Sequence, residues 1–512
     1  MIEFDMPLSM HILNQLWLSI ALLLPMILVA RTFVAGSRYS PILIIVIFGL
    51  LMGFVLVKTG ASSPGLPEFL LIDLMSKTTI IALIASFFVG GQELKKLFFS
   101  KDQEFEPDNS LIPAEEEVLQ GTNRTQLIFI VRAFFLLLGI EGVYRTLVQS
   151  QNSLTEVYPL LGYIGLVIAV ILIDHKAQIK NKRLYINKGF VEIAACLALM
   201  VVSYWLALAV QPIIALPQIF YAMMLAAALG AGLSHWQAGP TLRALLFAGI
   251  PVVLAANFMI GGSRIMEALA IEGVSSVLFY GFFGQLTWMF GGIALMMYFG
   301  KTKEVRNLAP GMAGGLSHSG LTGACTAGDL GKVAANRAPI MINVPFFGHV
   351  FVFSILAMSA AQGSLLVLPS LLIMLAGIGL TIISLRTLAK SNGRESQEVK
   401  GLMQFSFGWQ LTAMFGGMMT LAFFAMRLDY SAMAVSSALS HFGLFAAVQE
   451  GLFGAEAASM IPFIFSMPFL VHPFVFYLFG RAMSNNEQMP AKPVYILAAI
   501  GVIGSFSALI FI

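Results

Sequence analysis

The stretch QLTWMFGG at residues 285–292 returns as QLTAMFGG at residues 410–417, and the two copies differ at one position in eight. The offset stays nearly constant further along the chain, at 125 residues from Gln285 to Gln410 and 123 residues from His318 to His441. The other matched stretches are LSHSGL at 316–321 with LSHFGL at 439–444, and PIMINVPFFGHVFVF at 339–353 with PFIFSMPFLVHPFVF at 462–476. This near-constant spacing predicts an internal duplication.

The composition indicates that the duplicated region lies in a membrane. Of the 512 residues 58% are hydrophobic and 11% are charged, with a mean hydropathy of +0.87, whereas a soluble domain carries roughly 25% charged residues. A net charge of +3 gives no sign of a nucleic-acid partner. Cys196 and Cys325 lie in apolar surroundings, so a disulfide framework is not expected. The N-terminus lacks the basic region of a signal peptide, so the first apolar run is expected to stay as a helix.

Apolar runs long enough to cross about 30 Å of hydrocarbon recur along the chain. We therefore predict an all-α polytopic membrane protein with about 14 transmembrane helices. The predicted spans are 12–31, 40–57, 74–93, 126–148, 157–174, 189–210, 217–235, 243–262, 276–299, 340–361, 364–385, 405–426, 460–480 and 493–512.

Two further apolar stretches, 309–330 and 432–453, are rich in small and polar residues. The basic clusters after the first, third, fifth, ninth and eleventh spans all face the cytoplasm only if these two stretches do not cross. We therefore predict two re-entrant Gly-rich segments. Each repeat unit then holds three crossings, an odd number, which would insert the second copy upside down relative to the first and give inverted repeats.

The predicted organisation follows from these spans and loops. The units are 1–99, N-terminal transmembrane helices; 100–125, an acidic cytoplasmic loop; 126–275, central transmembrane helices; 276–386, repeat unit 1 with its re-entrant segment; 387–404, a cytoplasmic loop; and 405–512, repeat unit 2 with its re-entrant segment.

The first re-entrant segment carries the strongest candidates for binding a solute or ion. Its glycines permit close backbone approach, its hydroxyl groups can donate and accept hydrogen bonds, and freed helix ends attract anions or Na⁺. Packing of small-residue helices uses the same residue types and stays open as an alternative. The candidates are Gly314, Gly315, Ser317, His318, Gly320, Thr322, Gly323, Thr326 and Asp329.

The second copy and the neighbouring helices add further candidates. Glu450 or Asp329 would bind a coupling proton or cation if buried, or would sit at the water interface. The polar groups of the repeated QLT motif either line the path or join helices together. These candidates are Ser440, His441, Gly443, Glu450, Asn343, Gln285, Thr287, Gln410 and Thr412.

Four histidines form two repeat-related pairs, His318 with His441 and His349 with His472. They would hydrogen-bond a carboxylate, relay protons, pack, or ligate a metal or haem through imidazole. A haem- or metal-binding membrane protein is therefore one alternative reading, and a cation/proton antiporter that uses Glu450 or Asp329 is another.

The GG start at Gly314 and Gly315, the hydroxyl-rich segment after it and the run from LPQIF to NFMIGG over 216–262 resemble sodium/glutamate symporters and their relatives. The resemblance covers roughly 215–360 and does not include the extra terminal helices or the histidines. It implies Na⁺-coupled uptake of glutamate or a similar carboxylate, with Ser317, Gly320, Thr322 and Gly323 in the binding loop.

The favoured reading is a Na⁺- or H⁺-coupled symporter of a small organic anion rather than an enzyme. The chain has no nucleotide-binding motif, so ATP-driven transport by this chain alone is not expected. No cofactor is expected beyond the coupling ion, and the expected partners are the lipid bilayer and the solute, with a homodimer left open. The expected location is a bacterial inner membrane.

Overall fold

The computed structural model describes slightly more than half of the chain. The described residues are 21–33, 41–58, 78–92, 95, 123–148, 162–163, 165–166, 182–213, 216, 218–236, 238–249, 251–256, 258–259, 262, 275–302, 348, 351, 354–355, 358–359, 365–424, 470–471, 473–475, 477–478 and 490–511. Within these residues every regular element is a helix. The labelled elements are α2 (Pro41–Lys58), α5 (Asn123–Val148), α7 (Lys182–Val210), α8 (Gln218–Gly232), α9 (Pro240–Ala244), the π-helix η2 (Leu245–Gly249), α11 (Ser275–Phe299), α16 (Val367–Lys390), α17 (Glu395–Phe424) and α23 (Ala491–Ile510).

Several of these helices have the length and composition of membrane spans. The five that qualify among the described residues are Leu127–Val148, Lys188–Val210, Ser276–Phe299, Val367–Lys390 and Ala491–Ile510, and each falls on a span predicted from the sequence. Shorter apolar helices cover Ala21–Phe33, Leu43–Leu56, Thr78–Gln92 and Gln218–Gly232. The chain is thus an all-α integral membrane protein, while the count of fourteen spans stays a prediction.

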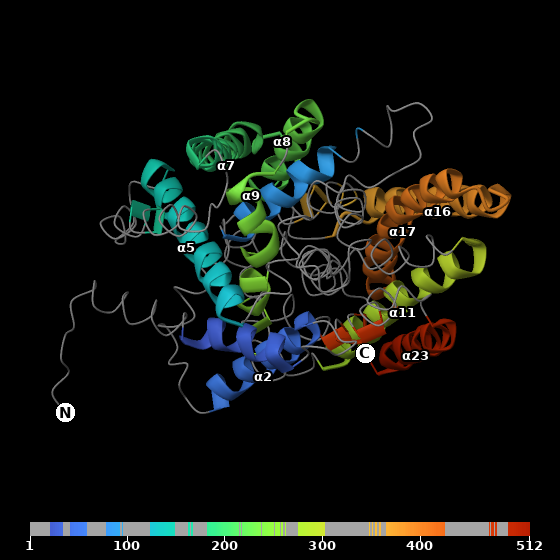
Figure 1. Cartoon of the computed structure of the whole chain (residues 1–512). Coiled ribbons are helices and arrows are strands. Elements are labelled where there is room, and N and C mark those ends of the chain that lie inside the picture. The colour runs from blue at the N-terminus through green and yellow to red at the C-terminus, as the bar shows by residue number, and fades with distance from the viewer. Residues whose placement is uncertain are drawn as a thin grey trace.

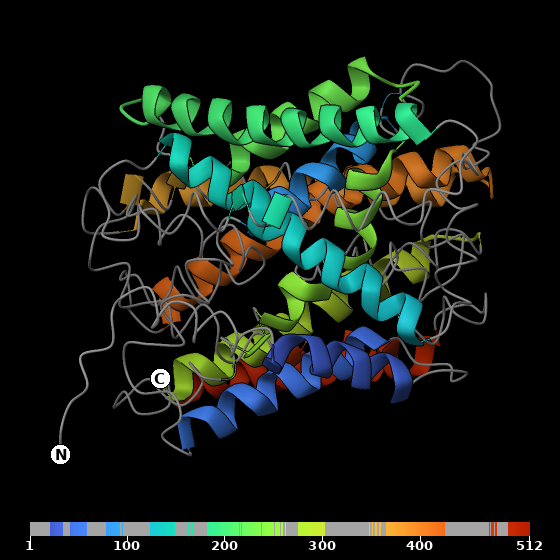
Figure 2. The same ribbon diagram turned by 60° about the vertical axis from the view of Figure 1, so that its left-hand side comes forward.

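The outer helices expose large apolar side chains. On α16 the exposed fraction of Leu372 is 58%, and on α23 that of Ile503 is 67%. Water would make such surfaces prone to association, whereas lipid tails solvate them at no cost. Figure 1 shows the described helices in two groups, with α5, α7, α8 and α9 on one side and α11, α16, α17 and α23 on the other. In Figure 2 the long helices α7, α16 and α23 are seen from the side.

The first group packs closely through glycines. A Cβ added at Gly91 would lie 1.9 Å from the carbonyl oxygen of Ala227, and one added at Gly230 would lie 1.9 Å from that of Phe88. The helix Thr78–Gln92 and α8 therefore touch backbone to backbone, which only glycine permits at these two positions. Nearby, the span predicted at 243–262 is broken locally, because α9 passes into the π-helix η2 before helix resumes at residue 251.

The second group contains a tight hairpin of α16 and α17. Residues 391–394 make the turn, in which Asn392 (φ 52°) and Gly393 (φ 78°) adopt the left-handed conformation that ends helices. The region 387–404, expected to be a cytoplasmic loop, holds more helix than its polar composition suggested. It comprises the end of α16, this turn and the first ten residues of α17.

Candidate functional site

The two copies of the QLT motif lie on α11 and α17, which run antiparallel. Tyr280 Oη donates a hydrogen bond to Gly417 O at 3.4 Å, and Trp409 Nε1 donates to Trp288 O at 2.8 Å. Residue numbers therefore rise along α11 while they fall along α17. The rings of Trp288 and Trp409 also touch edge to face, with their centroids 5.7 Å apart.

The first glycine of each GG pair makes room for the tryptophan of the other helix. A Cβ added at Gly416 would lie 3.3 Å from the Trp288 ring, and one added at Gly291 would lie 3.7 Å from the Trp409 ring. Gly291 and Gly416 occupy the same position in QLTWMFGG and QLTAMFGG. In both copies this glycine thus leaves space for an aromatic ring of the other helix to pack against it.

The outer helices α16 and α23 are the last spans of the two predicted repeat units, although none of the matched sequence stretches covers them. Each of the three buried residues of α23 has a buried counterpart on α16, 124 residues earlier: Val494 with Ser370, Gly501 with Gly377 and Ala508 with Ser384. Helix α16 buries Thr381 and Leu388 in addition. The three shared positions recur every seventh residue, which is the spacing of a helix packed along a seam. The repeat therefore extends beyond the matched sequence stretches, to the last helix of each unit.

Each outer helix packs on the first helix of the other unit. A Cβ added at Gly377 on α16 would lie 2.8 Å from Thr412 N on α17. A Cβ added at Gly501 on α23 would lie 2.5 Å from Thr287 N on α11. Because Thr287 and Thr412 are equivalent in the motif, the two helix pairs use equivalent contacts, and the repeat units exchange their last helices.

The motif threonines complete this exchange. Thr287 Oγ1 lies 3.2 Å from Ser505 Oγ, and Thr412 Oγ1 lies 3.4 Å from Thr381 Oγ1. Ser505 and Thr381 are themselves equivalent, 124 residues apart. These contacts join helices, the packing alternative left open by the sequence, and a role of the two threonines in binding an ion stays a prediction.

The motif glutamines Gln285 and Gln410 lie on the opposite face of their helices from the motif threonines. Residues two apart on an α-helix project about 200° apart, so Gln285 and Gln410 face away from the outer helix that each neighbouring threonine contacts. The exposed fraction is 3% for Gln285 and 1% for Gln410. Gln285 Oε1 is buried without a hydrogen-bond partner within the described part of the chain. A buried amide oxygen of this kind costs free energy unless something binds it.

Glu398 ties the end of α11 to the turn between α16 and α17. Its carboxylate accepts hydrogen bonds from Lys301 N at 3.1 Å, from Thr302 N at 2.9 Å and from Ser391 Oγ at 3.0 Å. The Thr302 hydroxyl donates a further bond. Burial alone raises the pKa of Glu398, but the hydrogen bonds from Thr302, Lys301 and Ser391 lower the pKa further than burial raises it. This contact could not be predicted from the sequence, because Glu398 lies in a polar stretch that is typical of a loop.

Two buried acids of the first group, Glu141 and Glu192, are held by partners within it. Arg145 and Glu141 form an ion pair at 2.8 Å, four residues apart on α5. Glu192 on α7 accepts hydrogen bonds from Trp236 Nε1 and from the backbone N–H groups of Gly239, Thr241 and Leu242. These acids are held by structural partners, and nothing in their contacts requires a solute.

The remaining candidates from the sequence lie outside the described residues. They are Gly314, Gly315, Ser317, His318, Gly320, Thr322, Gly323, Thr326, Asp329, Asn343, Ser440, His441, Gly443 and Glu450, together with His349 and His472 of the metal alternative. Both segments predicted to be re-entrant, 309–330 and 432–453, lie there as well.

Comparisons with known proteins assign no family to the chain. No protein-family model, curated protein or solved structure matches it.

Proposed function

We propose that the chain is a secondary active transporter that couples symport of a small organic anion, such as glutamate or another carboxylate, to Na⁺ or H⁺. The observation that carries the proposal is the exchange of equivalent helix contacts between two antiparallel repeat units. Inverted repeats around a central binding site are the common scaffold of secondary transporters.

Inversion of the repeat is supported by the directions of equivalent helices. The first helices of the two units, α11 and α17, run antiparallel through the contacts of Tyr280 and Trp409. If both helices cross the bilayer, a two-fold axis that relates them lies in the membrane plane, as an inverted topology requires. The sequence alone reached this inversion only through the count of basic residues.

The crossings of the first unit can be counted from its described ends. Glu398 brings residues 301 and 302, at the end of α11, to the turn that follows α16. Both helices therefore end at the same face, and α16 begins at the opposite face. If α11 and α16 both span the bilayer, an odd number of crossings is expected between them. Residues 303–366 contain two apolar stretches of spanning length, 309–330 and 340–361. We therefore propose that one of the two stretches returns to its own side.

The second unit leads to the same odd number of membrane crossings, from a different contact. Ser276 Oγ donates to Phe511 O at 3.1 Å, so α23 runs antiparallel to α11 and hence parallel to α17. If α17 and α23 both span the bilayer, an odd number of crossings is expected between them as well, and residues 425–490 again contain two apolar stretches, 432–453 and 460–480. In both units the returning stretch is the one rich in small and polar residues, because irregular backbone at membrane depth needs protein or water around it.

Gln285 and Gln410 would then line the interior toward which both returning segments lead. An amide oxygen is a ligand that Na⁺ accepts, and Gln285 Oε1 is buried without a partner in the described part of the chain. We assign the two glutamines to the coupling-ion path and the hydroxyl groups of 317–326 to the solute.

The test is uptake of radiolabelled glutamate and other carboxylates into proteoliposomes, with a Na⁺ gradient, a proton gradient or neither. Ser317→Leu and Thr322→Leu are expected to abolish uptake, and Gln285→Leu is expected to weaken its dependence on the ion gradient. Gly379→Leu is the matched control, since Gly379 has open space around it on the outer side of α16. Absence of gradient-driven uptake of any carboxylate would overturn the proposal, and so would full activity of Ser317→Leu and Thr322→Leu.

A further inference from the structure

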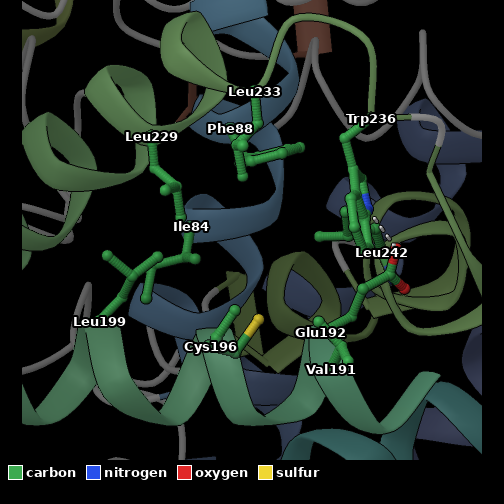
Figure 3. A pocket seen from close by; sticks show the side chains of 11 residues that line it. Ile84, Phe88, Val191, Glu192, Cys196, Leu199, Leu229, Leu233, Trp236 and Leu242 are labelled. Carbon is green, nitrogen blue, oxygen red and sulfur yellow. Dashed lines mark hydrogen bonds between the residues drawn. The ribbon is translucent and has the colours of Figure 1, made fainter. Parts of the chain in front are cut away.

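A cavity of about 80 Å³ opens between α7, α8 and the helix Thr78–Gln92, far in sequence from the repeat units. Its walls are apolar, and the side chains of Phe88, Cys196, Leu199 and Leu229 converge on it (Figure 3). At its edge Val191 is 53% exposed and Leu233 is 45% exposed. The cavity is thus entered from the outer surface of the molecule, where lipid tails lie.

One acid, Glu192, contributes to the wall, but its carboxylate is turned to hydrogen-bond donors. Trp236 Nε1 and Gly239 N reach one oxygen at 3.2 and 2.6 Å. Thr241 N and Leu242 N reach the other oxygen, both at 3.2 Å. Figure 3 shows the carboxylate beside the Trp236 ring. With four donors satisfied, Glu192 fixes the loop 233–239 as the end wall and needs no cation from outside.

Basic side chains gather at this end of the cavity. Lys188 Nζ lies 5.1 Å from the centre of the Trp236 ring, and Lys95 Nζ donates to Ser234 Oγ at 3.1 Å. Arg243 Nε donates to Ala238 O at 3.0 Å, which holds the guanidinium against the same loop. Three cations thus face a single acid within the described residues here. Tryptophan and basic residues at a helix end mark the level of lipid headgroups.

We propose that this cavity and its basic rim bind one anionic phospholipid. An acyl chain enters between Phe88, Cys196 and Leu229, and the phosphate group contacts Lys188, Lys95 and Arg243. Charge complementarity selects the lipid, since basic pockets between membrane helices bind anionic headgroups whereas apolar walls alone would accept any acyl chain. The site is independent of the transport path and would stabilise the packing of α7 on α8.

The experiment measures thermal unfolding of the purified full chain in a neutral detergent. The ligands added are dioleoylphosphatidylglycerol, dioleoylphosphatidylcholine or inorganic phosphate. We expect phosphatidylglycerol alone to raise the midpoint. The double variant Lys188→Gln with Arg243→Gln should need roughly thirty-fold more of this lipid for the same shift, because each basic residue contributes about a factor of five to ten.

Two further variants separate the headgroup from the acyl chain. Ala195→Phe fills the cavity without a change of charge and should also lose the shift, whereas Lys390→Gln removes a cation at the end of α16 and should keep it. An equal shift with phosphatidylcholine or with inorganic phosphate would overturn the proposal. A full shift in the Lys188 and Arg243 double variant would overturn it too. If Ala195→Phe does not fold, the comparison of the Lys188 and Arg243 double variant with Lys390→Gln tests the proposal without it.

Discussion

Helices α16 and α17 pack on each other through the same positions as α23 and α11. The two pairs differ in which helix contributes the larger side chain at one of these positions. In the first pair Leu380 of α16 lies against Gly408 of α17, and in the second Phe283 of α11 lies against Gly504 of α23. Leu380 and Gly504 are equivalent, and so are Gly408 and Phe283. The large residue therefore sits on the outer helix in one pair and on the inner helix in the other.

The duplication preserves the geometry of the contact and not the residues that fill it. The close approach of two helices is retained, together with one hydroxyl pair and one glycine in backbone contact. The identity of the residue that fills the space is not retained. Sequence identity is accordingly low between α16 and α23, although their buried positions match. Small residues at a membrane helix interface carry the packing, and lipid-facing positions vary freely.

Replacing the two glycines that touch the backbone of the neighbouring helix should destabilise the protein most. Gly377→Leu and Gly501→Leu each place carbon atoms where Thr412 N or Thr287 N already lies, so the helices must separate. We expect each to reduce the free energy of unfolding by about 3 kcal/mol or more. Thermal unfolding in detergent measures this, with Gly379→Leu as the control that should change little. A tolerated leucine at either glycine would show that the two pairs are not equivalent.

A smaller loss of stability is expected when the contact between Phe283 and Gly504 is redesigned to resemble the contact between Gly408 and Leu380. Gly504→Leu alone overfills the seam and Phe283→Gly alone empties it, so each should cost about 2 to 3 kcal/mol. The double variant recreates the arrangement of Leu380 and Gly408 and should recover most of the loss. A double-mutant cycle measures the coupling, which we expect to be at least 1 kcal/mol in favour of the pair. Simple additivity would refute the correspondence.

Replacing Glu398 should change the stability least, and the change should depend on pH. Among the described residues, only the pair of α16 and α17 has such a carboxylate. Its lowered pKa means that it stabilises the fold above its unfolded pKa of about 4.3. That contribution is lost as the pH falls through the lower folded pKa. Glu398→Gln should therefore lower the unfolding midpoint at pH 7, and the difference from the parent should shrink below pH 4.

The control for this prediction is Lys400→Gln, an exposed charge on the same helix. It should leave the pH dependence of unfolding unchanged. A difference between Glu398→Gln and the parent that stays constant from pH 7 to pH 3 would contradict the assignment of the carboxylate to the hydrogen bonds of Lys301 and Thr302.

Sequence reasoning reached the membrane class and the positions of the long helices, because both follow from runs of apolar residues. It also found the duplication, since QLTWMFGG is long enough to stand out. It placed 364–385 and 493–512 as the last spans of the two repeat units, but it found no residue match between them, because only Gly377 with Gly501 is identical among the three matched buried positions. Glu398 was missed for another reason: a buried carboxylate at the start of a helix has the same local sequence as an exposed one.

The roles of the motif residues could be predicted only as alternatives. Threonine in a membrane helix bonds either to a neighbouring helix or to a ligand, and the sequence around Thr287 is compatible with both. The packing of α23 on α11 gives Thr287 its partner, Ser505, which lies 218 residues away in the chain. Contacts at such separation have no local signature, whereas the apolar periodicity of a helix does.

The most direct test of the account is the sidedness of the segment after the first returning stretch. Cys196 and Cys325 are replaced by Ser, and single cysteines are introduced by Thr302→Cys, Ala334→Cys, Arg394→Cys and Ala457→Cys, then labelled in sealed vesicles with an impermeant thiol reagent; Arg394 is an exposed residue of the turn between α16 and α17. We expect Ala334→Cys to react from the same side as Thr302→Cys and Arg394→Cys, and Ala457→Cys from the opposite side. If Ala334→Cys instead reacts from the side opposite Arg394→Cys, residues 309–330 cross the bilayer and the inverted arrangement of returning segments is contradicted.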